Sequence, residues 1–336
     1  MLDRPAFPVL SELMGADVPV SGSFTLAGRQ FVVRDGILRA EEFVSPTQSQ
    51  TADVFGYKWN RRGTFDSENA RSVMRTWLYE RYGKPDEMPW LKDGVLVLDV
   101  GCGAALSAGE LFGERLKTLR YVGTDISNAL DVAAEKFRDE GWNGEFLQCD
   151  LNALPFRAAS CDVVFSEGVL HHTDSTEKAF HTVAKLVKPG GHFLFYVYRK
   201  KGPIREFTDD YVRAKLRALP PEKAWDAIVP LTKLGIALGK LKVDITVEED
   251  VDLLGIKAGT YDIQRFFYWN VAKAVYRDDL TLDEMAHVNF DWFAPLNAHR
   301  HTEQDVRGWC AAADFTIERE VIQESGITVI ARRAEG

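Results

Sequence analysis

An unbroken apolar run, Val95-Leu-Val-Leu-Asp-Val100, constrains the fold more than any other feature of this chain, and it leads directly into Gly101-Cys102-Gly103. A strand that is apolar at nearly every position is expected where both faces of a sheet are covered. Glycines directly after it let the backbone turn sharply and come close to a ligand. Strand-like and helical stretches then alternate as far as residue 199. This alternation predicts an α/β fold with a doubly wound, Rossmann-like parallel sheet.

We expect five segments along the chain, without an internal repeat. The first contains short strand-like runs and an Asp35-Gly36 turn, which is typical of a β-meander. The second contains a helix capped by Asp66 or Ser67. Prolines break the alternation after residue 200, which indicates an insertion. The segments are a small β segment at 1–50 that ends in a linker at 45–50, an aromatic linker and helix at 51–93, a ligand-binding core at 94–199, a mostly helical lid or substrate-binding insertion after the fifth strand at 200–301, and a helix and two strands that complete the sheet at 302–336.

Composition narrows the class of protein. The chain has 336 residues, of which 46% are hydrophobic and 27% charged, and its formal net charge is −9. This acidic balance argues against a nucleic-acid partner. The four cysteines lack Cys-x-x-Cys spacing, which predicts reduced thiols and no zinc site. We find neither a signal peptide nor a run of about 18 apolar residues, so we expect a cytoplasmic protein without membrane contact.

Two carboxylates follow the next two strands. Asp125 stands 22 residues after Gly103, which is the placement of an acidic residue that accepts ribose hydroxyls. The alternative is that Asp125 caps a helix starting at Ser127. Asp150 ends the third strand, where its carboxylate would accept the exocyclic amine of adenine, with Leu151 packed against the ring. The alternative is an aspartate that serves a turn.

Together with Val97-Leu-Asp-Val-Gly-Cys-Gly-Ala104, these landmarks resemble the class I S-adenosylmethionine-dependent methyltransferases. Asp162–His172 is similar to that family's fourth strand and following loop, and Leu186–Leu194 to its turn into the fifth strand. The resemblance is to the small-molecule branch called type 11. Leu106 stands where a nicotinamide dehydrogenase requires glycine or alanine. The resemblance implies S-adenosylmethionine as cofactor, contacted by Asp99, Gly101, Cys102, Gly103, Asp125, Ile126, Asp150, Leu151, Ser166, Glu167 and Gly168.

The N-terminal meander and Phe55-Gly-Tyr-Lys-Trp59 resemble a truncated Trm112-like segment that precedes some methyltransferase domains. Such segments often hold zinc through cysteines, and this one has none, so we expect no metal. The resemblance implies that Tyr57, Trp59 and Arg62 contact the cofactor, with Arg62 on its carboxylate. Aromatic packing between subdomains is the equal alternative.

Methyl transfer is a displacement at a sulfonium, so the protein has to align the acceptor, exclude water and, for an oxygen acceptor, remove a proton. His171 and His172 follow the fourth strand, on the side where the methyl group would lie. Histidine is the commonest general base near neutral pH. We expect one of the two to be the base and the other to be structural, with a slight preference for His171.

The acceptor site is predicted at the end of the fifth strand and in the insertion. Two interpretations of that insertion remain: a lid that covers the acceptor, or a helical subdomain that packs on itself. The His299-x-His301 pair alone does not make a metal site, and Arg300 would bind a carboxylate or phosphate. The predicted acceptor-site residues are Tyr196, Tyr198, Arg199, Tyr261, His299, Arg300 and His301.

Three functional hypotheses remain open from the sequence. The first is a small-molecule methyltransferase, a monomer or homodimer that acts on oxygen, nitrogen or carbon. The second keeps the cofactor but places the methyl group on tRNA or a protein. The third is a protein that binds S-adenosylmethionine without methylating anything.

Overall fold

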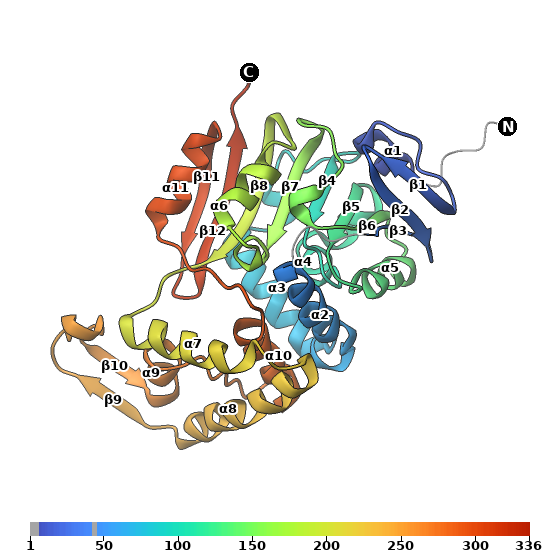
Figure 1. The fold of residues 1–336 in the computed structure, drawn as a ribbon. Helices are drawn as coiled ribbons and strands as arrows, with labels where there is room; N and C mark the ends of the chain where they lie inside the picture. The colour runs from blue at the N-terminus through green and yellow to red at the C-terminus, as the bar shows by residue number, and fades with distance from the viewer. Residues whose placement is uncertain (1–6, 42–45) are drawn as a thin grey trace.

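The computed structural model describes residues 7–41 and 46–336. Its central feature is a ten-stranded sheet in the order β1-β2-β3-β6-β5-β4-β7-β8-β12-β11 (Figure 1). The middle five strands run parallel, and β12 and β11 are antiparallel at one edge. The predicted α/β, Rossmann-like fold is therefore confirmed. These strands are β4 (Leu96–Val100), β5 (Arg120–Asp125), β6 (Gly144–Gln148), β7 (Cys161–Glu167), β8 (Val187–Tyr198), β11 (Phe315–Ile322) and β12 (Gly326–Arg333).

Helices cover both faces of the sheet, and this explains the apolar run of β4. Leu98 packs into one core with side chains from α1, α6 and α11, whereas Val97 packs into the opposite core with side chains from α3, α4 and α5. Because β4 lies between β5 and β7, the strand order reverses there, and a ligand crevice is expected at the carboxyl ends of these strands. The helices are α1 (Pro8–Met14), α3 (Glu68–Tyr82), α4 (Leu106–Phe112), α5 (Leu130–Asp139), α6 (Thr176–Ala184) and α11 (Glu303–Ala312).

The predicted meander is present, and it belongs to the main sheet. Strands β1 (Gly22–Leu26), β2 (Arg29–Arg34) and β3 (Ile37–Ala40) pair antiparallel, and β3 pairs parallel with β6. Asp35 and Gly36 both have positive φ, as the predicted Asp-Gly turn requires.

The linker predicted at 45–50 is wrong for residues 46–50, while residue 45 lies outside the described residues. The first turn of helix α2 (Pro46–Asn60) occupies this segment. Proline suits a first helical turn because its missing N–H needs no partner there. The cap predicted for the next helix is confirmed, since the Ser67 hydroxyl accepts a hydrogen bond from the Ala70 N–H at 3.1 Å.

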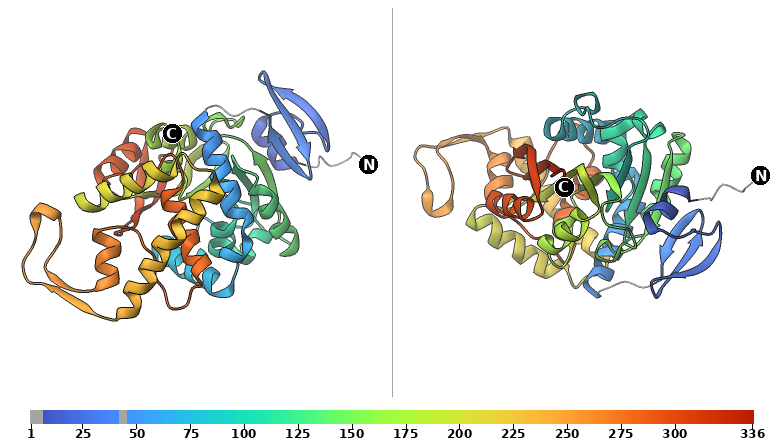
Figure 2. Two further views of the ribbon diagram at one scale, coloured as in Figure 1. Left: turned by 60° about the horizontal axis from the view of Figure 1, so that its bottom comes forward. Right: turned by 90° about the horizontal axis from the view of Figure 1, so that it is seen from above.

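The insertion is helical with one hairpin. The sequence predicted helices near 208–218, 222–238 and 262–278, and it missed both the hairpin and α10. The hairpin projects from the body of the molecule, and the helices pack beside α2 (Figures 1 and 2). Within the described residues, no helix is long and apolar enough to cross a bilayer. The elements are α7 (Pro203–Leu216), α8 (Pro221–Leu241), β9 (Asp244–Val247), β10 (Gly259–Asp262), α9 (Ile263–Asn270) and α10 (Leu282–Phe293).

Candidate active site

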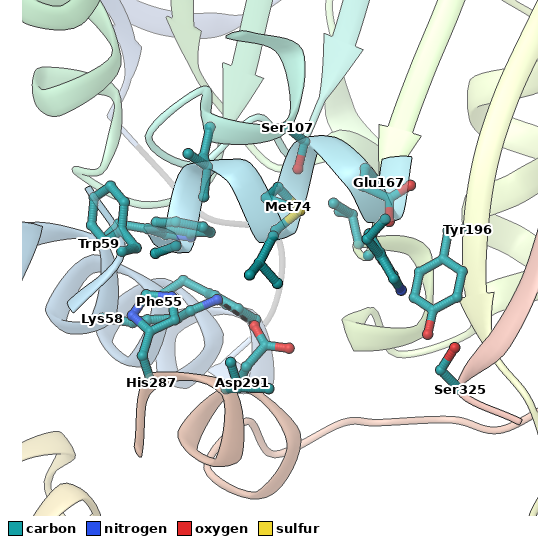
Figure 3. Close-up of a pocket in the computed structure, with 18 of the residues that line it drawn as sticks. Phe55, Lys58, Trp59, Met74, Ser107, Glu167, Tyr196, His287, Asp291 and Ser325 are labelled. Carbon is teal, nitrogen blue, oxygen red and sulfur yellow. Dashed lines mark hydrogen bonds and ion pairs between the residues drawn. The ribbon is translucent and has the colours of Figure 1, made fainter. Parts of the chain in front are cut away.

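A cavity of about 950 Å³ lies at the carboxyl ends of the parallel strands. One wall consists of strand-end residues, including Gly101, Asp125 and Gly168. We call it the strand-end wall. The opposite wall comes from α2 and from the segment from α9 to α10, and we call it the insertion wall. Figure 3 shows Glu167 and Tyr196 on one side of the cavity and Lys58, Trp59 and Asp291 on another.

The glycine loop is closely packed. Gly101 has φ +77°, and a Cβ there would lie 2.3 Å from Val169 Cγ1. Gly103 has φ +54°, and a Cβ there would lie 2.6 Å from the Trp59 indole nitrogen. Glycine is therefore required at both positions by backbone conformation and by space. Trp59 reaches the loop from α2, and both Trp59 and Gly101 line the cavity, whereas Gly103 lies just behind the indole.

Three predicted contacts lie behind this loop instead of facing the cavity. Tyr121 donates a hydrogen bond to Asp99 Oδ2 at 2.7 Å, and burial raises the pKa of Asp99 to about 8. The Ser166 hydroxyl donates to the Val100 carbonyl at 3.1 Å. Cys102 is buried, and burial raises its thiol pKa well above the usual value. These side chains hold the strand ends in place.

Asp125 lines the cavity, and protein donors already occupy most of its carboxylate. Oδ1 accepts from the Ser127 N–H and hydroxyl at 2.7 Å each, and Oδ2 accepts from the Gly103 N–H at 2.9 Å. A carboxylate has about four acceptor positions, so room remains for one further hydroxyl. The alternative, in which Asp125 caps a helix starting at Ser127, is wrong about the helix, because α5 begins at Leu130 and has no side-chain cap.

Asp150 combines both interpretations of its sequence position. Its Oδ1 accepts from the Asn152 N–H at 2.8 Å and so caps a short turn. Its Oδ2 is buried and has no hydrogen-bond partner among the described residues. A buried carboxylate oxygen without a donor is costly, but Asp150 itself does not line the cavity. Ile126 and Leu151, beside these two carboxylates, line the cavity.

Glu167 and Gly168 line the cavity near the end of β7. The Glu167 carboxylate is paired with Arg81 Nη2 at 3.0 Å and with the Tyr82 hydroxyl. Burial raises the pKa of Glu167, while the Arg81 charge lowers it. This fixed carboxylate belongs to the strand-end wall.

The second segment contributes one of its three predicted contacts. Trp59 lines the cavity, as described above. Arg62 donates instead to Glu135 at 3.1 Å. Tyr57 packs edge-on against Trp225 of the insertion, with ring centroids 6.2 Å apart. The structure therefore places Tyr57 and Arg62 outside the cavity lining.

The two histidines have different surroundings. His171 is fully buried, stacks on Tyr198 with ring centroids 3.6 Å apart, and does not line the cavity. His172 lines the cavity, and its Nδ1–H donates to the Asn297 carbonyl at 2.7 Å. This bond fixes the tautomer that leaves Nε2 as an acceptor, and Nε2 has no partner among the described residues. Burial lowers the pKa of His172 to about 4, so the ring is neutral at pH 7.

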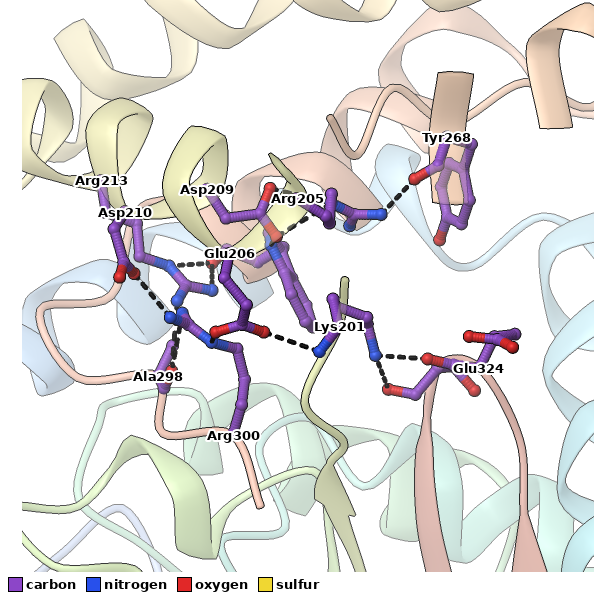
Figure 4. A network of polar contacts seen from close by, with 12 residues as sticks. Lys201, Arg205, Glu206, Asp209, Asp210, Arg213, Tyr268, Ala298, Arg300 and Glu324 are labelled. Carbon is purple, nitrogen blue, oxygen red and sulfur yellow. Dashed lines mark hydrogen bonds and ion pairs between the residues drawn. The ribbon is translucent and has the colours of Figure 1, made fainter. Parts of the chain in front are cut away.

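Of the predicted acceptor residues, Tyr196 and Tyr198 line the cavity and the other five do not. Arg300 pairs with Glu206 and Asp210, at 2.7 Å each, in a network that joins α7 to the chain leaving the insertion (Figure 4). The remaining four are engaged elsewhere: Arg199 with Glu303, Tyr261 with the Lys257 carbonyl, His299 with the Thr173 carbonyl and His301 with the Thr176 hydroxyl.

A polar group in the insertion wall was missed from sequence. Asp291 accepts from the Tyr198 hydroxyl at 2.7 Å and is paired with Lys58. Lys273 and His287 line the cavity beside it. His287 and Asp291 are four residues apart and share a face of α10, but that helix also carries Asp283, Glu284 and Asn289, so this spacing was a weak signal. Lys58 and Asp291 are separated by 233 residues, so no local pattern pairs them.

The described part of the chain contains no cluster of three or more histidine, cysteine, aspartate or glutamate side chains suited to a metal ion. The cavity is thus built from hydrogen-bonding groups, the two neutral imidazoles of His172 and His287, and aromatic rings. These features suit an organic ligand held by polar contacts at a few positions.

Comparison with known proteins finds a family match over the strands that carry the strand-end wall. Residues 98–195 match the family model described as a methyltransferase domain. The tRNA (carboxymethyluridine(34)-5-O)-methyltransferase ALKBH8 of Mus musculus is 33% identical over 129 residues, covering 37% of this chain and 18% of that protein. Phosphoethanolamine N-methyltransferase 2 of Caenorhabditis elegans is 28% identical over 173 residues, covering 49% and 36%.

Among solved structures, magnesium protoporphyrin IX methyltransferase (ChlM) from Synechocystis PCC 6803 with bound SAH aligns with a TM-score of 0.46 and 14% identity, over 86% of this chain and 100% of that chain. The family match agrees with the methyltransferase domain expected over these residues. The chain spans about a fifth of the length of the first curated relatives that it matches.

Proposed function

We propose that this chain is an S-adenosylmethionine-dependent methyltransferase of the small-molecule branch, with His172 as its general base. The observation that carries the proposal is His172, which lines the same cavity as the strand-end residues Gly101, Asp125 and Leu151 and whose buried Nε2 has no hydrogen-bond partner among the described residues. A free acceptor nitrogen beside a nucleotide-type site supports proton removal next to a bound cofactor.

The residues of the strand-end wall fit S-adenosylmethionine. The free Oδ2 of Asp150 would accept the adenine amine, and the remaining acceptor position of Asp125 would take one ribose hydroxyl. Leu151 would pack against the adenine ring, and Gly168 would border the methionine part. When bound, the cofactor supplies an activated methyl group on a sulfonium. The N-terminal meander, on this proposal a truncated Trm112-like segment, extends the sheet next to β6.

His172 would act on the acceptor. The Asn297 carbonyl holds its Nδ1–H, so the ring presents Nε2 in the neutral form that burial favours. For a hydroxyl acceptor, the O–H bond breaks and the proton passes to Nε2. A bound cofactor would supply the methyl group to that oxygen and would keep the electron pair of its carbon–sulfur bond on sulfur. Such proton removal contributes about 100- to 10,000-fold to a rate.

The test is release of S-adenosylhomocysteine from S-adenosylmethionine in the presence of a fractionated low-molecular-weight cell extract. We expect release that depends on one fraction, with incorporation of the labelled methyl group into a small product. If no fraction causes release of S-adenosylhomocysteine, methyl transfer to a small molecule is contradicted. That result would favour a protein that binds the cofactor without using it.

A tRNA acceptor is the second candidate, because the first curated relatives are described as tRNA methyltransferases. The formal net charge of −9 weighs against it, since phosphate binding depends on Lys and Arg side chains. Filter binding of labelled tRNA at low salt distinguishes the two. We expect no retention, and salt-dependent retention together with methylated tRNA would replace the small-molecule proposal.

A further inference from the structure

Lys273 has a buried ammonium group without a protein partner in the cavity. The side chain lies between α9 and α10 and is 8% exposed, and its Nζ lies 4.8 Å from the centre of the Trp292 ring. Lys58, in the same cavity, is paired with Asp291. Among the described residues, Lys273 Nζ makes no hydrogen bond and no ion pair, although it lines the cavity.

Lys201 is a largely buried lysine whose amino group is surrounded by backbone carbonyl acceptors, and it serves as a comparison for Lys273. Its Nζ donates to the carbonyls of Arg199 at 2.8 Å, Ser325 at 3.2 Å and Glu324, outside the cavity (Figure 4). Burial lowers the pKa of both Lys201 and Lys273 to about 7. The two lysines are thus alike in desolvation and differ in acceptors. An ammonium without acceptors in such a place is costly until an anion arrives.

Two ion pairs close to Lys273 contribute no net charge. Lys58 of α2 and Asp291 of α10 form one neutral pair. Arg205 and Asp209 of α7 form another, with Nε 2.9 Å from Oδ2.

Burial lowers the pKa of His172 and His287 and raises the pKa of Tyr198 and Tyr268, so these four groups are neutral at pH 7. Lys201 and Arg213 lie over the same Trp292 ring as Lys273, and Arg265 of α9 lines the cavity. These neighbours add positive charge, so this part of the cavity would attract an anion.

The shape of the wall indicates what carries that anion. Tyr198, Tyr268 and Trp269 line the cavity with Lys273, so the site is bounded by flat rings. Asp291 interacts electrostatically with both Lys273 and His172. The two side chains therefore both lie near one carboxylate. Aromatic walls with one fixed charge are suited to a planar ligand whose orientation is set by a single ionic contact.

We propose that Lys273 binds the carboxylate of a flat aromatic hydroxy acid, which is the acceptor, and so directs its hydroxyl toward His172. This inference rests on the proposed function. It assigns Lys273 as the specificity residue that separates an anionic acceptor from its neutral analogue. Loss of this ionic contact would leave the contacts with the aromatic ring intact. The preference for the anionic acceptor over its neutral analogue would therefore change more than the affinity for the ring itself.

The test compares carboxylate and amide partners with matched rings, at saturating S-adenosylhomocysteine. The probes are 4-hydroxybenzoate, 4-hydroxycinnamate and 6-hydroxy-2-naphthoate with their carboxamides, titrated by tryptophan fluorescence. We expect at least one carboxylate to bind at least tenfold more tightly than its amide. K273M should abolish that ratio and K273R should retain it. K257M is the matched control, because Lys257 is exposed and paired with Asp250 in the hairpin.

A second measurement needs no variant. Trace acetylation of the wild-type protein at pH 7, followed by peptide mass analysis, should modify Lys273 ahead of exposed lysines, and the preferred carboxylate should protect it. Equal binding of every carboxylate and amide pair, or labelling of Lys273 that no carboxylate changes, would overturn the inference while S-adenosylhomocysteine binding stands. Absence of S-adenosylhomocysteine binding would instead overturn the proposed function.

Discussion

The strand-end wall and the insertion wall enclose one cavity but are built in different ways. In the strand-end wall, Asp125, Asp150 and Glu167 directly follow parallel strands or end them, and backbone N–H groups or nearby side chains hold them. In the insertion wall, Asp291 is held by a lysine and a tyrosine from distant parts of the chain. The first wall therefore depends on sheet topology, whereas the second depends on how the insertion packs. We expect the first to determine cofactor binding and the second to determine the acceptor.

Breaking the packing of the insertion should have the largest effect on stability. Asp209 is fully buried and accepts from Arg205 at 2.9 Å and from the Trp292 indole at 2.8 Å. D209N removes the charge and leaves Arg205 buried without a counter-ion, so the free energy of unfolding should fall by about 3–5 kcal/mol. Chemical denaturation measures this change.

The neighbouring variant D210N is its control. Asp210 is exposed and pairs with Arg300 at the surface, so the loss should stay below about 1 kcal/mol. If the two walls are independent, folded D209N should still bind S-adenosylhomocysteine with unchanged affinity. A large loss of cofactor affinity in folded D209N would contradict the division between the walls.

Removing the base should affect catalysis and leave cofactor binding intact. H172Q keeps a side chain of similar length but removes the Nε2 acceptor, so the methyl-transfer rate should fall about 100- to 10,000-fold. Turnover with the acceptor fraction measures this rate. H171F preserves an aromatic ring against Tyr198 and should retain most activity. The opposite ranking of the two variants would transfer the role of base to His171.

Two buried groups near the strand ends should also respond oppositely to pH. Burial lowers the pKa of His172 to about 4, below its unfolded value of 6.5, so its contribution to stability is lost as pH falls from about 6.5 to about 4. Burial raises the pKa of Asp99 to about 8, above its unfolded value of 3.8, so its contribution to stability is lost as pH rises from 3.8 to about 8.

Thermal or chemical unfolding of H172Q and D99N across pH 4–9 separates these effects. Each variant should flatten one arm of the wild-type profile, because each unit of pKa shift is worth about 1.4 kcal/mol of stability. Identical profiles for the wild type and both variants would show that neither group is as desolvated as the structure has it.

Sequence-based prediction succeeded better for the strand-end wall than for the insertion wall. Gly101, Asp125 and Leu151 were predictable because parallel strands bring their carboxyl ends to one edge, and that placement depends only on local patterns. Their hydrogen bonds were not predictable, since the N–H groups that occupy Asp125 appear only in three dimensions.

The insertion wall was largely beyond prediction. Arg300 and His301 had suitable chemistry, but ion pairs and hydrogen bonds direct them away from the cavity. Lys273 and Asp291 gave no comparable local signal, because their environment comes from helices that meet only in the folded chain. The linker at 46–50 failed for a related reason, since Ser, Thr and Pro there begin a helix that packs under the insertion.

Calorimetric titration of S-adenosylhomocysteine into the wild-type protein and D125A tests the central claim most directly. We predict saturable one-to-one binding by the wild type, and an affinity about 5- to 150-fold lower for D125A, which corresponds to about 1–3 kcal/mol for a lost charge-assisted contact. D139A, an exposed change at the far end of α5, should bind like the wild type. Absence of binding to the wild type, or equal affinity in folded D125A, would contradict the account.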